Sequence, residues 1–131
     1  MGEMNEDLRA LLLADAGIAA VVGPRVDWTA RPEGDPLPAI VLHQVTGAPL
    51  SQTLDGPSAA QVARVQVDCW AVDFGTAKRL SRAVLAALSG HRGGGFTGVF
   101  HAATRDGREG GTNEAVRPYR TSLDFTIHHK P

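Results

Sequence analysis

One stretch decides the fold, Arg64-Val65-Gln66-Val67-Asp68-Cys69-Trp70-Ala71. Its apolar and polar side chains alternate with a period of two, which is typical of a strand that has one buried face. Val65, Val67 and Cys69 share the face expected to meet the core. The alternation ends near Asp73, where a helical pattern takes over. The sequence therefore predicts a central strand over 61–71 that leads directly into an amphipathic helix.

The helix after this strand is indicated by an apolar stripe at helical spacing. The stripe consists of Phe74, Ala77, Leu80, Val84, Leu85 and Leu88. Asp73 is a plausible N-cap because its carboxylate can accept from the first free backbone N–H groups. Gly90 is expected to close the helix.

The rest of the chain predicts a single α+β domain over residues 1–131. Leu8, Leu11 and Leu12 indicate a first helix, and 16–22 a second, short one. Further strands are expected at 39–46, 96–104 and 116–129, with a short one at 25–29, and the connections at 30–38, 47–58 and 105–114. We expect about four strands in a mainly antiparallel sheet, with two or three helices packed on one face.

Composition narrows the class of protein. The chain has 131 residues and a formal net charge of −1, so nothing in the charge balance indicates a nucleic-acid-binding module. Cys69 is the single cysteine, which gives no disulfide framework and suits a reducing compartment. The acidic start and the short apolar runs indicate neither a signal peptide nor a membrane span. We expect a soluble intracellular protein with no membrane partner.

Several short motifs suggest chemistry that their context does not support. Asp73-Phe74-Gly75 matches a kinase magnesium motif, but the glycine loop, the pairing lysine and the catalytic loop are missing. Gly93-Gly94-Gly95 follows a helix and is not followed by Gly-Lys-Ser/Thr, so it indicates a turn rather than a phosphate site. The five histidines show no metal-ligand spacing. We expect no catalytic residue, no cofactor and no metal.

Polar side chains of two predicted strands would form one surface if those strands pair. They are Arg64, Gln66, Asp68 and Trp70 on the first strand and Arg120, Ser122 and Asp124 on the second. One interpretation is a solvated sheet face with chance ion pairs. The other is a subunit interface, because Trp and Arg are enriched at interfaces. The sequence leaves both interpretations open, and the candidate interface residues are Arg64, Gln66, Asp68, Trp70, Arg120 and Asp124.

The order of segments resembles the small tail-completion proteins of long-tailed phages, prophages and gene transfer agents. The resemblance extends from about Leu8 to His129, and the string 65–70 is its most distinctive part. It is carried by Leu8 to Leu13, Ala19 to Val26, Pro36 to Leu42, Leu54 to Pro57, Arg64 to Ala71, Ala77 to Gly90 and Arg120 to Phe125. The loop 105–114 departs from the family pattern, being longer and richer in glycine.

The resemblance implies a structural tail terminator. Such a protein forms a homo-oligomeric ring, usually a hexamer, that caps the head-proximal end of the tail tube and offers a surface to the head-side connector. DNA would pass through the ring without being read. The implied partners are other copies of the chain, the tube protein and the connector, in the host cytoplasm during assembly and then in the virion. A neighbouring head–tail connector, a minor tail component or a small ligand-binding domain are the alternatives.

The two long predicted loops are candidates for contacts with the tube or the connector. The residues that we expect to make these contacts are Gln52, Leu54, Asp55, Arg105, Arg108 and Glu109.

Overall fold

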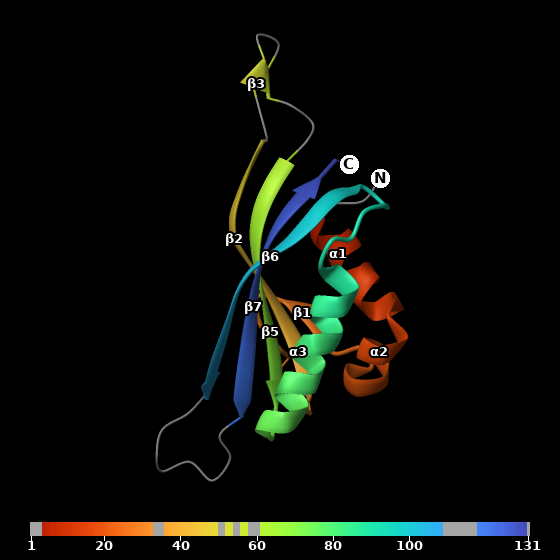
Figure 1. Cartoon of the computed structure of the whole chain (residues 1–131), viewed down its shortest axis with the longest axis vertical. Coiled ribbons are helices and arrows are strands. Elements are labelled where there is room, and N and C mark those ends of the chain that lie inside the picture. Colours follow the sequence, from red (N-terminus) through yellow and green to blue (C-terminus); the bar gives the residue numbers. More distant parts are fainter. Residues whose placement is uncertain are drawn as a thin grey trace.

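In the computed structural model, three helices pack on one side of a strongly twisted sheet (Figure 1). The structure describes residues 4–32, 36–49, 52–53, 56–57, 61–108 and 118–130, and for 46–49, 52–53, 56–57 and 61 it describes the backbone alone. The elements are α1 (Met4–Ala14), α2 (Ala16–Val22), β1 (Val26–Trp28), β2 (Ala39–Pro49), β3 (Gln52–Thr53), β4 (Gly56–Pro57), β5 (Gln61–Ala71), α3 (Phe74–Leu88), β6 (Phe96–Arg108) and β7 (Tyr119–His129). The prediction of an α+β fold with helices on a sheet is confirmed.

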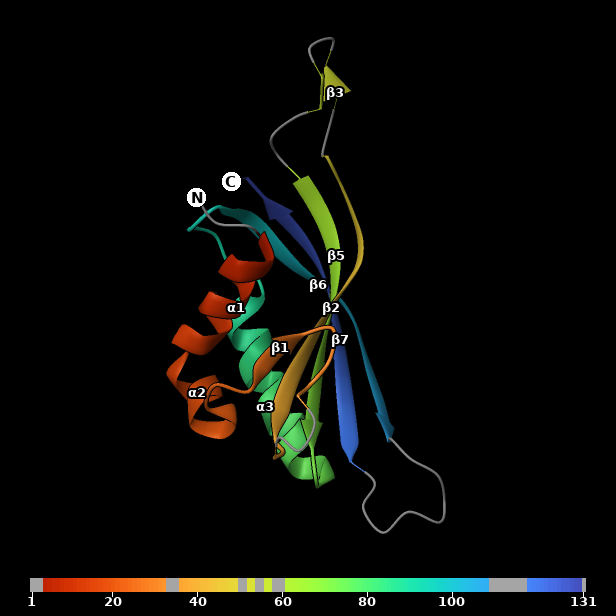
Figure 2. The same ribbon diagram turned by 180° about the vertical axis from the view of Figure 1, so that it is seen from behind.

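The main sheet has the strand order β1-β2-β5-β7-β6. β1 runs parallel to β2, and every other neighbouring pair is antiparallel. The short strand β1 is thus the fifth member of a sheet that we expected to have about four strands. β2 and β5 extend together beyond the helices towards the small β3–β4 pair, as the view from behind also shows (Figure 2). The predicted central strand 61–71 is confirmed, because β5 pairs with β2 on one side and with β7 on the other.

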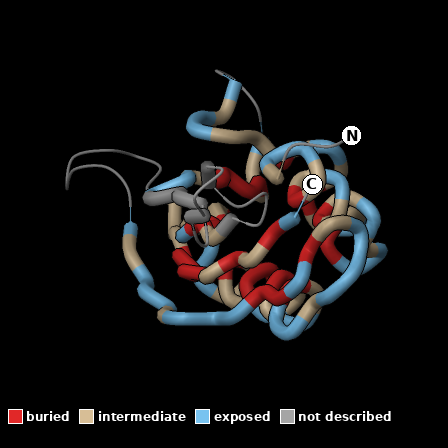
Figure 3. Tube along the Cα trace, turned by 90° about the horizontal axis from the view of Figure 1, so that it is seen from above, coloured by how far each residue is buried: buried red, intermediate tan, exposed pale blue. Residues whose placement is uncertain are grey.

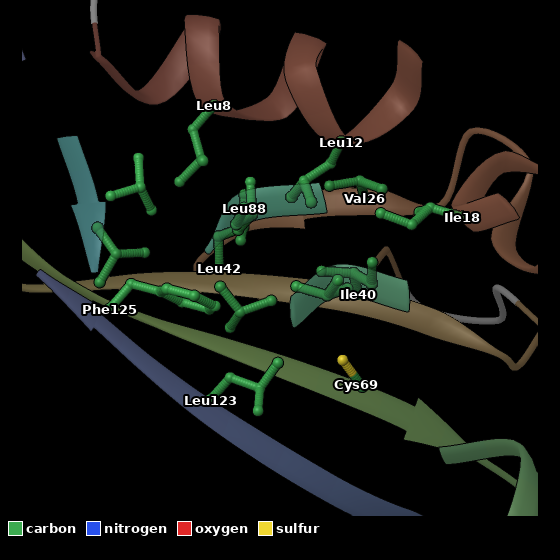
Figure 4. Close-up of a cluster of buried hydrophobic side chains, with 14 of the residues drawn as sticks. Leu8, Leu12, Ile18, Val26, Ile40, Leu42, Cys69, Leu88, Leu123 and Phe125 are labelled. Carbon is green, nitrogen blue, oxygen red and sulfur yellow. The ribbon is translucent and has the colours of Figure 1, made fainter. Parts of the chain in front are cut away.

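The core lies between the helices and the sheet, where the buried residues gather (Figure 3). Leu8 and Leu12 of α1 point towards Leu42 and Phe125 of the sheet (Figure 4). As predicted, Val65, Val67 and Cys69 of β5 are fully buried. Burial raises the pKa of the Cys69 thiol, and the negative charge of Asp68 adds to the effect. A thiol held neutral in this way is a core side chain rather than a reactive one.

α1 is fastened to the sheet by polar contacts as well as by its leucines. The indole Nε1 of Trp28 donates to the backbone oxygen of Asn5 at 2.9 Å, and Arg9 Nε donates to the oxygen of Val26 at 2.7 Å. From the same turn of α1, a carboxylate oxygen of Asp7 lies 3.0 Å from Nε2 of the buried His129 on β7. These contacts link the first helix to both β1 and β7, so helix and sheet form one unit. No helix within the described residues is long and apolar enough to cross a membrane.

Two predicted boundaries were wrong. β6 continues to Arg108, whereas we expected a loop from 105. The strand is extended by pairing with β7 up to Arg108 and Tyr119, where the guanidinium lies over the tyrosine ring at 4.3 Å. β2 likewise runs to Pro49 instead of ending at 46. In both cases polar side chains and glycines suggested a loop, but the neighbouring strand supplied backbone partners.

Asp73 caps α3 as the sequence predicted. Its carboxylate accepts from the backbone N–H of Thr76 at 2.8 Å and from the Thr76 hydroxyl at 2.8 Å. The backbone hydrogen bond, helped by the hydroxyl, lowers the pKa of Asp73 below its usual range. A carboxyl with a lowered folded-state pKa stabilises the fold fully above its ordinary value of about 3.9 and loses that contribution as the pH falls through the lowered value.

We therefore expect Asp73→Ala to lower the melting temperature at pH 7 by a few degrees, because the first turn of α3 loses its acceptor. Asp73→Asn keeps an acceptor and should retain most of the stability at pH 7. Thermal unfolding between pH 2 and pH 7 checks both variants. A melting temperature of Asp73→Ala equal to that of the wild type at pH 7 would contradict the capping role.

Candidate functional site

The sheet face opposite the helices is covered by no described element, and we call it the open face (Figures 1 and 2). β5 and β7 pair antiparallel along their whole length, so the polar side chains predicted to share a surface do so. Their register pairs are Arg64 with Thr126, Gln66 with Asp124, Asp68 with Ser122, and Trp70 with Arg120. β2 adds His43 to this face beside Gln66, and β6 adds Arg105 beside Ser122.

Asp68 is the centre of a hydrogen-bond network on the open face. Its side chain is buried, although no helix covers it. One carboxylate oxygen accepts from the hydroxyl of Ser122 at 2.6 Å and from Nε2 of Gln66 at 2.8 Å. The other oxygen lies 3.3 Å from Nε2 of His43. These partners replace the water that a buried carboxylate would otherwise need.

A second carboxylate on the open face is neutralised across the strands. Asp124 forms an ion pair with Arg105, whose Nη2 lies 3.3 Å from Oδ1, and the same Nη2 donates to Oε1 of Gln66 at 3.1 Å. The hydrogen bond to Asp124 raises the pKa of Arg105, so the guanidinium stays charged. Gln66 therefore joins the two networks, since it donates to Asp68 and accepts from Arg105. The centre of the open face is held in one arrangement before any partner binds.

The histidine, aspartate and serine of this network do not form a hydrolase triad. In a triad the histidine lies between the carboxylate and the hydroxyl, so that it can take the proton of the nucleophile. Here Asp68 lies between His43 and Ser122, and the hydroxyl of Ser122 donates to the carboxylate. This arrangement fixes side chains and leaves Ser122 without a base. Within the described residues no group of three or more His, Cys, Asp or Glu side chains could hold a metal ion.

Trp70 and Arg120 form a separate cluster towards one end of the open face. The guanidinium of Arg120 lies over the Trp70 ring, 5.5 Å from its centroid. On the other side it lies so close to Gly107 that a β-carbon there would be 3.3 Å from its Nη2. Nε of Arg120 is buried and has no hydrogen-bond partner among the described residues. A cation thus lies between an aromatic ring and a glycine, and its buried Nε donor has no acceptor among the described residues.

Of the residues predicted to lie on partner-contact loops, the structure places three on strands, and the other three lie outside the described residues. Arg105 and Arg108 lie on β6, and Arg105 pairs with Asp124 within the chain while about half of its side chain remains exposed. Gln52 lies in β3. Leu54, Asp55 and Glu109 lie outside the described residues.

The sequence interpretation did not include His43 or the corner at the start of α3. At that corner Lys78 forms an ion pair with Asp106 at 2.8 Å, and Asp106 accepts from the hydroxyl of Thr121 at 2.9 Å. Phe74, which is exposed, meets Tyr119 edge to face at 6.0 Å. The alternation of β2 could have assigned His43 to the open face. The corner joins segments far apart in the chain, for which sequence spacing carries no signal.

Comparison with known proteins identifies the family of this chain. The family model described as "Tail completion protein gp17" matches residues 6–130, which is nearly the whole chain. The chain belongs to the tail completion protein gp17 family. It is therefore a structural protein of phage-type tails, as the resemblance in its sequence implied. The match includes the strands of the open face, α2, α3 and all of α1 from Glu6 onward.

A solved structure has the same fold. The chain is similar to a chain of the structure described as "Virion of native gene transfer agent (GTA) particle", with a TM-score of 0.63 and 21% sequence identity. The alignment covers 95% of this tail completion protein and 94% of that chain. At this identity the likeness concerns the fold. Among curated proteins no sequence match was found.

Proposed function

We propose that this tail completion protein is a tail terminator that assembles into a ring, most simply a hexamer, at the head-proximal end of the tail tube. The ring would stop tube polymerisation and present a surface to the head-side connector. DNA would pass through it without sequence-specific contacts, consistent with a net charge of −1. The protein would act in the host cytoplasm during assembly and then remain in the virion. Membership of the tail completion protein family is the observation that supports a role in the tail.

The open face is the observation that supports self-assembly. A mainly antiparallel sheet commonly packs one face on helices and leaves the other to solvent, so it is the side chains on this open face that support an interface. The face carries Trp70 and Arg120, residue types that are enriched where protein partners meet. Its carboxylates Asp68 and Asp124 are already paired, so a partner would not have to desolvate free negative charges. The remaining interface candidates, Arg64 and Gln66, lie beside them on the same face.

A ring needs two different surfaces on each copy, because head-to-tail contacts close only when one patch meets a second. The open face and the helical side lie on opposite sides of the sheet (Figure 2). Contact between them would be head-to-tail, and such contacts close into a ring when the rotations from one copy to the next add up to a full turn. For contact with the tube or the connector we propose Gln52, Leu54, Asp55, Arg105, Arg108 and Glu109. β3, which contains Gln52, and the end of β6 at Arg108 lie towards opposite ends of the molecule (Figure 1).

The purified protein should test this function in two steps. We expect light scattering after size exclusion to give a mass of about six subunits, and negative-stain images to show rings. Added to purified tube protein, it should give tubes that are capped at one end and stop growing. Tubes that lengthen as fast with the protein as without it would contradict termination. A cap formed on an isolated connector, but not on tubes, would instead favour a head–tail connector.

A further inference from the structure

In the cluster of Trp70, Arg120 and Gly107, the guanidinium of Arg120 has no carboxylate partner among the described residues. Its Nε is buried and has no acceptor among them. Buried donors in native proteins are nearly always paired, and an unpaired one calls for a partner. The buried polar side chains of the open face, Asp68, Ser122 and Asp124, all have partners within the chain. Nε of the half-buried Arg120 has none among the described residues.

The guanidinium is also positioned in advance. The ring of Trp70 supports one side of it, and the missing side chain of Gly107 makes room on the other. An arginine placed between two neighbours in this way can present its N–H groups as a planar fork, which matches the two oxygens of a carboxylate. Because little side-chain entropy remains to be lost, an arriving carboxylate would gain more than it would at a mobile surface arginine.

Charge complementarity indicates where that carboxylate comes from. Arg64, which is exposed on the same face, also has no ion-pair partner among the described residues, so the open face offers two unpaired cations. The opposite side of the molecule carries Glu6, which is exposed in the acidic first turn of α1 and has no ion pair within the described part of the chain. A second copy that approaches with its helical side would bring negative charge to these arginines.

We propose that Arg120 binds a carboxylate of a second copy of this chain, and that Trp70 and Gly107 hold the guanidinium ready for it. Glu6 is the first carboxylate to examine. This inference rests on the proposed ring, and it names the chemical partner of one position in the ring contact. Arg120→Glu should then weaken self-association at least about 30-fold, because like charges would face each other. Arg92→Glu is the charge-matched control, because Arg92 is exposed in the turn between α3 and β6 and lies neither on the open face nor on a helix. It should leave association within about 3-fold of the wild type.

Zero-length cross-linking tests the carboxylate directly. In an Arg120→Lys variant, a water-soluble carbodiimide activates a nearby carboxyl group, the lysine amine displaces the urea, and an amide bond forms. We would mix ¹⁴N- and ¹⁵N-labelled copies and identify linked peptides by mass spectrometry. The expected result is a link from position 120 to an acidic residue of the other isotope, with no such link from position 92 in Arg92→Lys.

The outcomes separate this inference from the proposed function. Rings that form normally but give no link between copies at position 120 overturn the inference and leave the ring intact. Links at position 120 within one copy only also overturn it. A wild-type chain that stays monomeric both alone and on tube ends overturns the ring and, with it, this inference. Thermal unfolding of each variant confirms that any lost association is not lost folding.

Discussion

Phe125→Ala is expected to be among the most destabilising single substitutions in this chain. Phe125 is fully buried on β7, opposite Val65 of β5, and its ring faces the leucines of α1 (Figure 4). Truncating a buried phenylalanine costs about 3–5 kcal/mol, since both the transfer free energy and the packing around the cavity are lost. Domains of this size are stable by only about 5–15 kcal/mol. Urea unfolding at a dilute, fixed protein concentration measures the loss.

Phe100→Ala is the matched control for this substitution. Phe100 lies on the neighbouring strand β6 but on the open face, where it is 51% exposed and contacts His128 edge to face. The same truncation there should cost less than about 1 kcal/mol. Equal losses for the two variants would mean that the side of the sheet facing the helices is not the main core. Protein concentration is held fixed because self-association stabilises the folded state.

The sequence was sufficient to predict the strand over 61–71 and the helix after it, for a physical reason. The alternation of Val65, Val67 and Cys69 is forced by a strand with one buried face, and Asp73 is a cap whose partner lies only three residues away. Both signals are local. They survive in any arrangement of the remaining chain, so one sequence suffices to detect them.

The candidate site could be predicted only in part. Alternation assigned Arg64, Gln66, Asp68 and Trp70 to one face, and strand pairing then brought Arg120 beside Trp70. That Asp68 is buried could not be predicted, because its partners Ser122 and His43 come from two other strands. The extension of β6 was missed for a similar reason.

The burial of Asp68 and Asp124 bears on the two interpretations of the open face. A solvated face with chance ion pairs would leave its charged groups exposed and exchangeable with water. Instead, Asp68 is 2% exposed and Asp124 is 8% exposed, although no described element covers them. The side chains around them act as the covering layer. The carboxylates at the centre of the open face are thus already desolvated, although Arg64 and Arg105 remain exposed, and this lowers the free-energy cost of placing another protein over them.

Trp70→Ala is expected to have the largest effect on assembly of any truncation on the open face. Trp70 is only partly buried in the single chain and supports Arg120. If a second copy covers it, truncation removes a large aromatic contact and releases the guanidinium, for a loss of at least about 2 kcal/mol, or about 30-fold in the association constant. Concentration-dependent light scattering measures that constant. The loss in folding stability of the dilute chain should stay smaller, since the open face has no covering layer to lose.

Trp28→Ala is the matched control, since it makes the same change of side chain but is expected to affect folding stability more than association. Trp28 lies on β1 at the helical side, packs against the core and donates its indole N–H to Asn5 of α1. Its truncation should lower the free energy of unfolding because α1 loses both packing and a hydrogen bond. Its effect on the association constant, measured on the folded fraction, should be the smaller of the two. If Trp70→Ala unfolds the chain as severely as Trp28→Ala and the remaining folded protein associates normally, Trp70 is a structural residue and the open face is not where copies meet.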